Sequence, residues 1–313
     1  MPPDPSAWDS PPTVEVVRAA LRRVLPEATE LPLDLRARQA DVPSPYRHGM
    51  AFVGDYVVKF AWSDSAREIL LQQGRLLAAL PELRVPIPRP IAIAEDPPLL
   101  VYRKLPGNAL PWTAEVWTDA RRVKTIGHQL GELLAEVHAP RVLAAIESAG
   151  LRLRAPSPQS TPESLRQRMF PMLDARRAEL AEGLVTAVAA RLRLSSARVF
   201  LQGDFHGHNL LVSDDSSHVI GLLDFEESGA GDRAYDFRYL PALGPTLDLL
   251  FAVMQSYARV SGERVDLWRV LAWHVLTDLG DALWRTEQGA DVVDGPLARR
   301  FDDLLIRLAR AGW

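Results

Sequence analysis

The chain lacks cysteine and has no long apolar run. None of its 313 residues is cysteine, which excludes disulfide bonds and any chemistry that depends on a thiolate. No stretch approaches the roughly 18 consecutive apolar residues of a membrane-spanning helix. Residues 1–10 are acidic and rich in proline, unlike the basic and apolar segments of a signal peptide. These absences predict a soluble cytoplasmic protein that does not act in a membrane.

Positive charge is also scarce. The 36 Lys and Arg residues are outnumbered by 40 Asp and Glu residues, which gives a net charge of −4. Binding to nucleic acid requires a basic face, so we expect no nucleic-acid partner. With 47% apolar and 24% charged residues the composition is that of a globular enzyme, and the length suffices for one large core or two lobes. Monomer and homodimer both remain possible.

The acidic residues are unevenly distributed. Residues 201–313 contain 18 Asp and Glu against 10 Lys and Arg, a difference of −8, so the first 200 residues sum to +4. Most of these carboxylates are interpreted as solvated surface. The excess also suggests that this half of the chain receives a cation, either a metal ion or a cationic substrate.

The pattern of apolar residues divides the chain into two parts. Residues 1–105 contain strand patterns around two helices, expected at 13–25 and 64–80, and Gly54-Asp55 is typical of a tight hairpin turn. Residues 106–313 are mainly helical, except for a hairpin expected within 198–226. Strands and helices do not alternate as in a parallel sheet, so we predict an α+β fold with a strand-rich N-lobe and a helical C-lobe.

Three polar residues near the centre of the chain have the spacing of a phosphoryl-transfer site. Asp204 is followed after 5 residues by Asn209 and after 15 more by Asp224, with the expected hairpin between them. Transfer of a phosphoryl group needs Mg²⁺, which prefers carboxylate and amide oxygens, and a separate carboxylate to orient the acceptor hydroxyl. Asp204, Asn209 and Asp224 therefore predict a site for phosphoryl transfer.

This segment resembles the aminoglycoside phosphotransferase family, a kinase-like group that also contains macrolide and other antibiotic or metabolite kinases. The family's catalytic loop reads roughly H-G-D-x-x-x-x-N, and residues 202–209 match it except that Gln202 replaces the histidine. The run 229–237 resembles the family's G-x-G-D-P-x-x-D, with Arg233 in place of proline. The resemblance implies that Asp204 is the catalytic base, that Asn209 and Asp224 are metal ligands, and that Asp236 is a buried carboxylate that braces the catalytic loop.

The resemblance extends toward the N-terminus and implies a protein-kinase-like two-lobed fold that binds ATP or GTP with Mg²⁺. Lys59, one of only three lysines, matches the strand lysine that holds the α- and β-phosphates. Residues 44–49, including Ser44 and Tyr46, fall where the loop that covers the phosphates belongs. Residues 99–107 look like the hinge, where backbone groups of Arg103 and Leu105 would contact the purine.

In kinase-like folds a glutamate from the neighbouring helix orients the strand lysine. Glu68 is the only glutamate within residues 64–80. At about 100° per residue, however, Gln73 lies at the centre of the apolar stripe of that helix, and Glu68 lies on the opposite face. We therefore expect Gln73 to contact Lys59, and we expect Gln73→Glu to be tolerated because it would restore an ion pair.

The function implied by these residues is Mg²⁺-dependent transfer of the γ-phosphate of ATP or GTP to a hydroxyl group of a small molecule. An antibiotic is the first expectation, in particular an aminoglycoside, because a polycation suits the acidic C-terminal half. Macrolides, nucleoside antibiotics and small metabolites are alternative acceptors. A nucleotide-binding module without catalytic activity is an alternative of a different class. A protein kinase is disfavoured, because no A-P-E run follows Asp224.

Overall fold

The computed structural model describes residues 10–37, 47–111, 117–156, 158–193, 197–289 and 296–313. By their internal contacts the residues form two compact units. The N-terminal unit comprises residues 1–107 together with 145–151 and 221–226, and the C-terminal unit comprises the remainder. Asp224, which the sequence-based division places in the C-lobe, therefore packs with the N-terminal unit. Among the described residues, no helix is long and apolar enough to cross a membrane.

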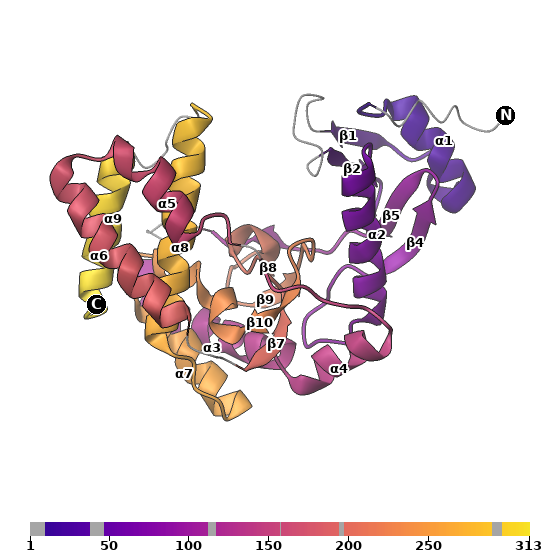
Figure 1. The fold of residues 1–313 in the computed structure, drawn as a ribbon. Helices are drawn as coiled ribbons and strands as arrows, with labels where there is room; N and C mark the ends of the chain where they lie inside the picture. Colours follow the sequence, from indigo (N-terminus) through magenta and orange to yellow (C-terminus); the bar gives the residue numbers. More distant parts are fainter. Residues whose placement is uncertain (1–9, 38–46, 112–116, 157, 194–196, 290–295) are drawn as a thin grey trace. The chain divides into compact units, whose positions relative to one another are not determined.

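The N-terminal unit is built on a five-stranded antiparallel sheet with the strand order β1-β2-β3-β5-β4 (Figure 1). Its elements are α1 (Val14–Val24), η2 (Pro26–Ala28), β1 (Leu33–Ala37), β2 (His48–Val53), β3 (Tyr56–Ala61), α2 (Asp64–Ala79), β4 (Pro90–Glu95) and β5 (Pro98–Arg103). The turn expected between β2 and β3 is confirmed. Val53 pairs with Tyr56, and Gly54 between them adopts a φ of 57° that favours glycine.

The two helices of this unit pack against the sheet through different strand residues. Val58 and Phe60 of β3 form a core cluster with residues of α1. Because successive side chains of a strand point to opposite faces, Lys59 points to the other face, where α2 lies. Gly74 of α2 permits a close approach there, since a Cβ at this position would lie 3.1 Å from Ile93 of β4. Lys59 is thus held under a closely packed helix.

The C-terminal unit is mainly helical, as the sequence predicts. The division between the units falls within α4 (Pro140–Ser148) and β9 (Val219–Leu222), whose first residues belong to the C-terminal unit. Its other elements are β6 (Asn108–Ala109), α3 (Ala120–Val137), α5 (Pro162–Arg168), η5 (Phe170–Met172), α6 (Ala175–Leu192), β7 (Arg198–Leu201), η6 (Gly207–Asn209), β8 (Leu210–Val212), β10 (Gly229–Asp232), η7 (Arg233–Phe237), η8 (Leu240–Ala242), α7 (Asp248–Ser261), α8 (Leu267–Glu287) and α9 (Leu297–Arg310). The expected hairpin is formed by β8 and β9, which extend to β6. β7 and β10 form a separate antiparallel pair.

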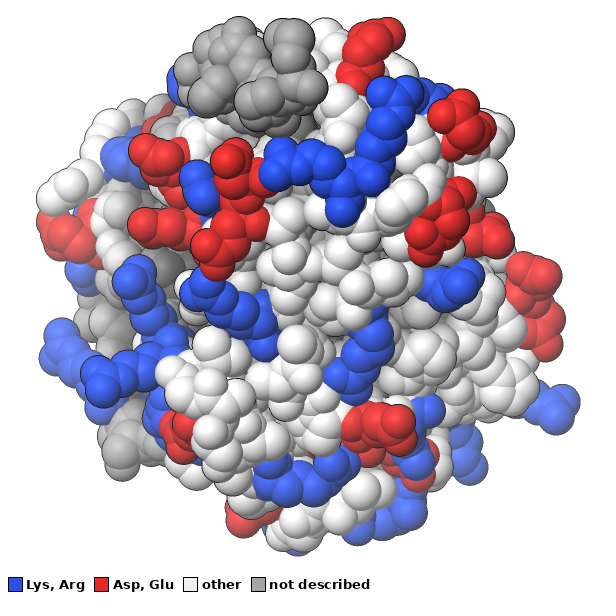
Figure 2. Space-filling view, turned by 90° about the vertical axis from the view of Figure 1, so that its right-hand side faces the viewer, with Lys and Arg blue, Asp and Glu red and all other residues white. Residues whose placement is uncertain are grey.

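Two helical layers support these strands. α3 and α7 pack closely, because Gly131 of α3 leaves room for the backbone of α7: a Cβ there would lie 2.4 Å from the carbonyl oxygen of Val253. α5, α6, α8 and α9 share a second core cluster (Figure 1), which includes Val185, Leu279 and Phe301. On the face of the molecule drawn in Figure 2, positive and negative side chains are interspersed.

Candidate active site

The loop that carries Asp204 depends on a tightly placed glycine. Gly203 has a φ of 92°, and a Cβ at this position would lie 1.9 Å from the carbonyl oxygen of Glu227. Any other residue would clash with the backbone there. Gln202 also holds the loop, because its side-chain oxygen accepts a hydrogen bond of 2.8 Å from the backbone N–H of Asp204. Gln202 therefore stabilises the loop at the position where the family resemblance leads one to expect histidine.

Asp236 anchors the same loop through its backbone N–H groups. Its two carboxylate oxygens accept hydrogen bonds of 2.9 Å from the backbone N–H groups of Gln202 and Gly203. Nε2 of His138 lies 3.1 Å from the Asp236 carboxylate, and Nδ1 lies 3.3 Å from the hydroxyl of Tyr257. Asp236 has no exposed surface. Because a buried carboxylate is costly unless its oxygens are paired, these contacts make Asp236 a rigid support of the loop.

The carboxylate of Asp204 is held by three side chains. Oδ2 accepts a hydrogen bond of 2.9 Å from Nδ2 of Asn209 and lies 3.0 Å from Nε2 of His206. Oδ1 accepts a hydrogen bond of 3.0 Å from the hydroxyl of Tyr239. Nδ1 of His206 accepts the backbone N–H of His208, which leaves the ring proton on Nε2, facing Asp204. The carboxylate is thus fixed in orientation.

Arg238 is a buried cation next to this carboxylate. Its guanidinium lies 3.8 Å from Oδ1 of Asp204 and donates a hydrogen bond of 2.6 Å to the carbonyl oxygen of Gly203. The aromatic rings of Tyr235 and Tyr239 lie against it, with centroids 3.8 and 4.3 Å from the guanidinium carbon. Only 4% of Arg238 is exposed. The arginine therefore joins the loop backbone to the aromatic residues beside Asp204.

These neighbours determine the charge of Asp204. Burial alone raises the pKa of this carboxyl, but the hydrogen bond from His206, the charge of Arg238 and the hydrogen bond from Tyr239 outweigh it. The pKa of Asp204 consequently lies below its ordinary value, and the group is ionised at neutral pH. Burial raises the pKa of Tyr239, so its phenol remains a donor. Asp204 is thus an ionised carboxylate among hydrogen-bond donors.

Asn209 has the chemistry of a metal ligand. Its Nδ2 donates hydrogen bonds to both the backbone oxygen and Oδ2 of Asp204, each at 2.9 Å. Its Oδ1 accepts no hydrogen bond from any residue that the structure describes. An amide oxygen held in this way, and a carboxylate such as Asp224, whose side chain is 39% exposed, are the ligands that Mg²⁺ prefers. The residues therefore fit the metal that the resemblance implies.

Lys59 is at the centre of a polar cluster in the N-terminal unit. Its Nζ donates hydrogen bonds of 2.7 Å to Oε1 of Glu226, 3.1 Å to Oδ1 of Asp224 and 3.4 Å to Oε1 of Gln73. Nε2 of Gln73 donates to the same oxygen of Asp224 at 3.2 Å. Glu68 is exposed, whereas only 3% of Gln73 is. The predicted helix phase is therefore correct, but Gln73 is not the main partner of the lysine.

The two carboxylates compensate the charge of Lys59. Burial alone lowers the pKa of this amine, but the charges of Asp224 and Glu226 outweigh it and raise the pKa above its ordinary value.

The backbone of Asp224 is strained, since it adopts a φ of 49°, a conformation that non-glycine residues seldom adopt. Such local strain persists only where the surrounding structure enforces it, as at functional sites.

The residues expected to contact the purine lie at the end of β5. The backbone of Arg103 pairs with Tyr56 of β3, and its guanidinium lies 5.3 Å from the centre of the Tyr56 ring. Leu105 follows in a segment without regular structure. Their contact with a nucleotide stays a prediction. Ser44 and Tyr46 lie outside the described residues.

The acidic residues of α8 are paired with arginines. Asp281 accepts hydrogen bonds from Arg285 at 2.9 Å and from Arg300 of α9 at 3.1 Å. Asp278 lies 3.5 Å from Arg300 and 3.9 Å from Arg307. The acidity of residues 201–313 therefore overstates the charge that α8 can offer to a cationic ligand.

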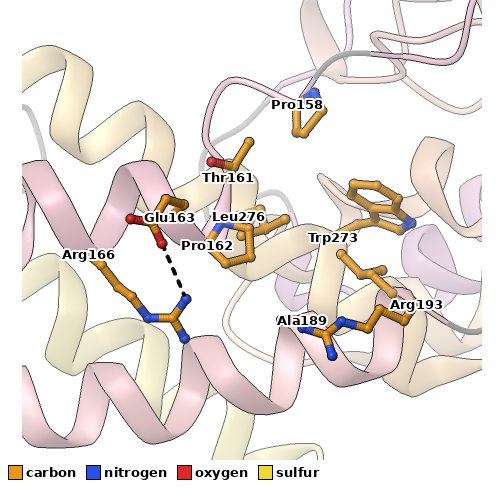
Figure 3. Close-up of a pocket in the computed structure, with 10 residues that line it drawn as sticks. Pro158, Thr161, Pro162, Glu163, Arg166, Ala189, Arg193, Trp273 and Leu276 are labelled. Atoms are coloured by element: carbon orange, nitrogen blue, oxygen red, sulfur yellow. Dashed lines mark ion pairs between the residues drawn. The ribbon is translucent and has the colours of Figure 1, made fainter.

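A pocket of about 420 Å³ opens among α5, α6 and α8 (Figure 3). Its lining is mainly apolar, with charged groups from Glu163, Arg166 and Arg193. The apolar lining residues are Pro158, Pro162, Ala189, Leu192, Trp273 and Leu276. Trp273 is fixed there because its indole N–H donates a hydrogen bond of 2.9 Å to the buried carboxylate of Asp232.

The structure brings the predicted residues together in two groups. Asp204 contacts Asn209 in the C-terminal unit, and Lys59 contacts Gln73 and Asp224 in the N-terminal unit. Sequence analysis did not identify four neighbours of these groups: Glu226, His206, Arg238 and Tyr239. A signal did exist for Arg238, a charged residue between the apolar Phe237 and Leu240.

Solved structures with a similar fold include aminoglycoside and macrolide phosphotransferases. The chain is similar to an aminoglycoside 2'-phosphotransferase-IIIa (TM-score 0.66, 20% identity, 95% of this chain and 98% of that chain). It is also similar to the macrolide 2'-phosphotransferase of Brachybacterium faecium (TM-score 0.58, 22% identity, 94% of this chain and 97% of that chain). At this level of identity the likeness establishes the fold, which is that of kinase-like phosphotransferases.

The sequence itself also matches a family model. The model describes the phosphotransferase enzyme family and matches residues 44–274, which include Lys59, Asp204, Asn209 and Asp224. The match covers well over half of the chain. This protein therefore belongs to the phosphotransferase enzyme family.

Proposed function

We propose that this protein transfers the γ-phosphate of ATP or GTP to a hydroxyl group of a small-molecule antibiotic. The observation that carries the proposal is the ionised carboxylate of Asp204, held by His206, Asn209 and Tyr239 within the residues that the family model matches. Similar enzymes have been solved with GDP, with ATP and with ADP, so either purine nucleotide is a reasonable donor.

Asp204 is the proposed proton acceptor, and its geometry indicates which oxygen acts. Oδ2 already has donors in both Asn209 and His206, whereas among the described residues only Tyr239 donates a hydrogen bond to Oδ1. A carboxylate oxygen has two lone pairs, so Oδ1 retains one for the acceptor hydroxyl. As the hydroxyl oxygen bonds to the γ-phosphorus and the bond to the leaving diphosphate breaks, the proton passes to Oδ1.

The other predicted residues would hold the donor. Lys59 would bind the nucleotide phosphates, and Gln73 would help to position it. Asn209 and Asp224 would each supply an oxygen to Mg²⁺, which when bound neutralises charge on the phosphates. We further propose that backbone groups of Arg103 and Leu105 contact the purine and that the loop containing Ser44 and Tyr46 covers the phosphates.

Two acceptor classes are supported by different observations. An aminoglycoside is the first candidate because residues 201–313 carry a net excess of acidic residues. A macrolide is the second candidate because the acidic residues of α8 are neutralised by arginines and the pocket among α5, α6 and α8 is mainly apolar. Electrostatic attraction between these acidic residues and a polycationic acceptor would favour the aminoglycoside.

Nucleotide consumption across a panel of hydroxylated antibiotics, with ATP and with GTP, tests this function. We expect turnover with at least one aminoglycoside or macrolide. For a cationic acceptor we expect KM to rise with added salt, because charges farther apart than about 8 Å are screened at physiological ionic strength. A KM that does not change with salt would favour a macrolide. Absence of turnover with the whole panel would contradict the proposal.

The proposed metal ligands can be tested through binding alone. We expect Asp224→Ala and Asn209→Ala each to weaken nucleotide binding about tenfold in Mg²⁺, or about 1.4 kcal/mol, and much less in Mg²⁺-free buffer. The physical reason is that their contact with the nucleotide runs through the metal. Calorimetry in both buffers measures the difference, and Asp214→Ala in the exposed β8–β9 turn is the control. Equal losses in both buffers would show that the two residues act only structurally.

A further inference from the structure

The three hydrogen-bond donors of Lys59 are all occupied by acceptors in the N-terminal unit. A lysine ammonium has three N–H groups, and the three acceptors are Glu226, Asp224 and Gln73. Only 7% of Lys59 is exposed, so the ammonium cannot turn to water instead. Its orientation is therefore determined by these three partners.

Glu226 is the closest of the three partners. Its Oε1 lies 2.7 Å from Nζ of Lys59, and its Oε2 lies 3.8 Å from Nε2 of His48 on β2. Its side chain is 19% exposed, compared with 39% for Asp224. Glu226 thus contacts two neighbouring strands of the sheet, whereas the carboxylate of Asp224 is more accessible to a ligand.

Gln73 complements this arrangement as an amide. Its oxygen faces the ammonium of Lys59, and its N–H group donates to Oδ1 of Asp224 at 3.2 Å. A glutamate at position 73 would place a carboxylate oxygen against Asp224 without a proton between them. It would also be the third carboxylate around one ammonium, after Asp224 and Glu226. Unlike the expectation from the sequence, we therefore expect Gln73→Glu to be unfavourable, because Asp224 and Glu226 already supply two carboxylates to Lys59.

We infer that Glu226 is the positioning residue of Lys59, and that the carboxylate supplied by a helix glutamate in kinase-like folds lies here in the segment after Asp224. With Glu226 and Gln73 holding two N–H groups, the third, which now contacts Asp224, is the one available to a phosphate oxygen. The inference rests on the proposed function for the role of Lys59. The pairing of Lys59 with Glu226 does not depend on that function.

The first test measures thermal unfolding without nucleotide or metal. Gln73→Glu should lower the unfolding midpoint of the wild-type protein by about 4 °C or more. In the Glu226→Gln background the same change should lower it by less than half as much, because two carboxylates then surround Lys59, as in the wild type. Glu68→Gln, on the exposed face of α2, should have no effect in either background. An equal loss from Gln73→Glu in both backgrounds would overturn the pairing.

The second test measures turnover with a confirmed acceptor. Glu226→Gln should lower kcat roughly tenfold, because small displacements of a positioning group are costly. Adding Gln73→Glu to Glu226→Gln should restore kcat to within about threefold of the wild type, although Gln73→Glu alone should lower it. Failure of this rescue, together with a loss that disappears at high Mg²⁺, would show that Glu226 binds the metal instead. A wild-type protein without turnover would contradict the proposed function and leave the unfolding test intact.

Discussion

Asp204→Ala is expected to reduce turnover with a confirmed acceptor by about 10²-fold or more while leaving nucleotide affinity nearly unchanged. The substitution removes the oxygen that would accept the proton of the acceptor hydroxyl. It also leaves His206 and Tyr239 without the carboxylate that they contact. It does not touch Lys59 or its partners, which would hold the phosphates. Steady-state kinetics and calorimetry with the same nucleotide measure the two effects separately.

The control for this experiment is Asp303→Ala, which removes an exposed carboxylate from α9. It should leave both turnover and nucleotide affinity unchanged, because Asp303 pairs at 3.9 Å with Arg299, which is also exposed on α9. Near-normal turnover of Asp204→Ala would mean that this loop does not carry the catalytic base. A parallel loss of nucleotide affinity would mean that the loop acts mainly by shaping the nucleotide site.

Asp236→Asn is expected to cause a large loss of both stability and turnover. Oδ2 of Asp236 accepts the N–H of Gln202 and lies against Nε2 of His138, and Oδ1 accepts the N–H of Gly203. Whichever oxygen is replaced, the NH₂ group of the new amide would face at least one backbone N–H group. Leaving such buried donors unpaired costs on the order of 3 kcal/mol, and the loop carrying Asp204 would lose its support. Urea unfolding should show the loss of stability, and kcat at a temperature where the variant is folded should fall about tenfold or more.

Asp232→Asn separates the loss of stability from the loss of activity. Asp232 is also a buried carboxylate of the run 229–237, but it accepts hydrogen bonds from Arg269 and Trp273 and does not contact the catalytic loop. We expect it to lower stability to a similar extent and to change kcat less than about threefold. If both variants lost kcat equally, Asp236 would contribute only to the general stability of the unit.

Much of the local structure could be predicted because it depends on neighbours in the sequence. The face of α2 follows from 3.6 residues per turn, so Gln73 could be placed toward Lys59 and Glu68 toward solvent without any structure. The hairpin of β8 and β9 followed from two apolar runs around a polar turn. The approach of Asn209 to Asp204 was also predictable, because only five residues separate them within one loop.

Apart from His206, which lies two residues from Asp204, the partners that the sequence did not indicate come from distant segments. Glu226 is 167 residues from Lys59 along the chain, and neither helix period nor strand alternation can relate the two. Tyr239 lies 35 residues after Asp204 in the sequence, shortly after η7, and the fold brings its hydroxyl to the Asp204 carboxylate. The pairing of α8 carboxylates with α9 arginines likewise depends on how two helices pack, which the charge count of residues 201–313 could not reveal.

The sequence alone determined the α+β class, the candidate proton acceptor, the candidate metal ligands and the strand lysine, because residue type and short-range spacing decide what chemistry a loop or strand can offer. The tertiary structure decided how each of these groups is held. It showed that Asp204 is ionised among donors from His206, Asn209 and Tyr239, and that two carboxylates rather than a neutral amide balance the charge of Lys59. Burial and long-range contact determine charge and orientation, and they exist only once distant segments pack together.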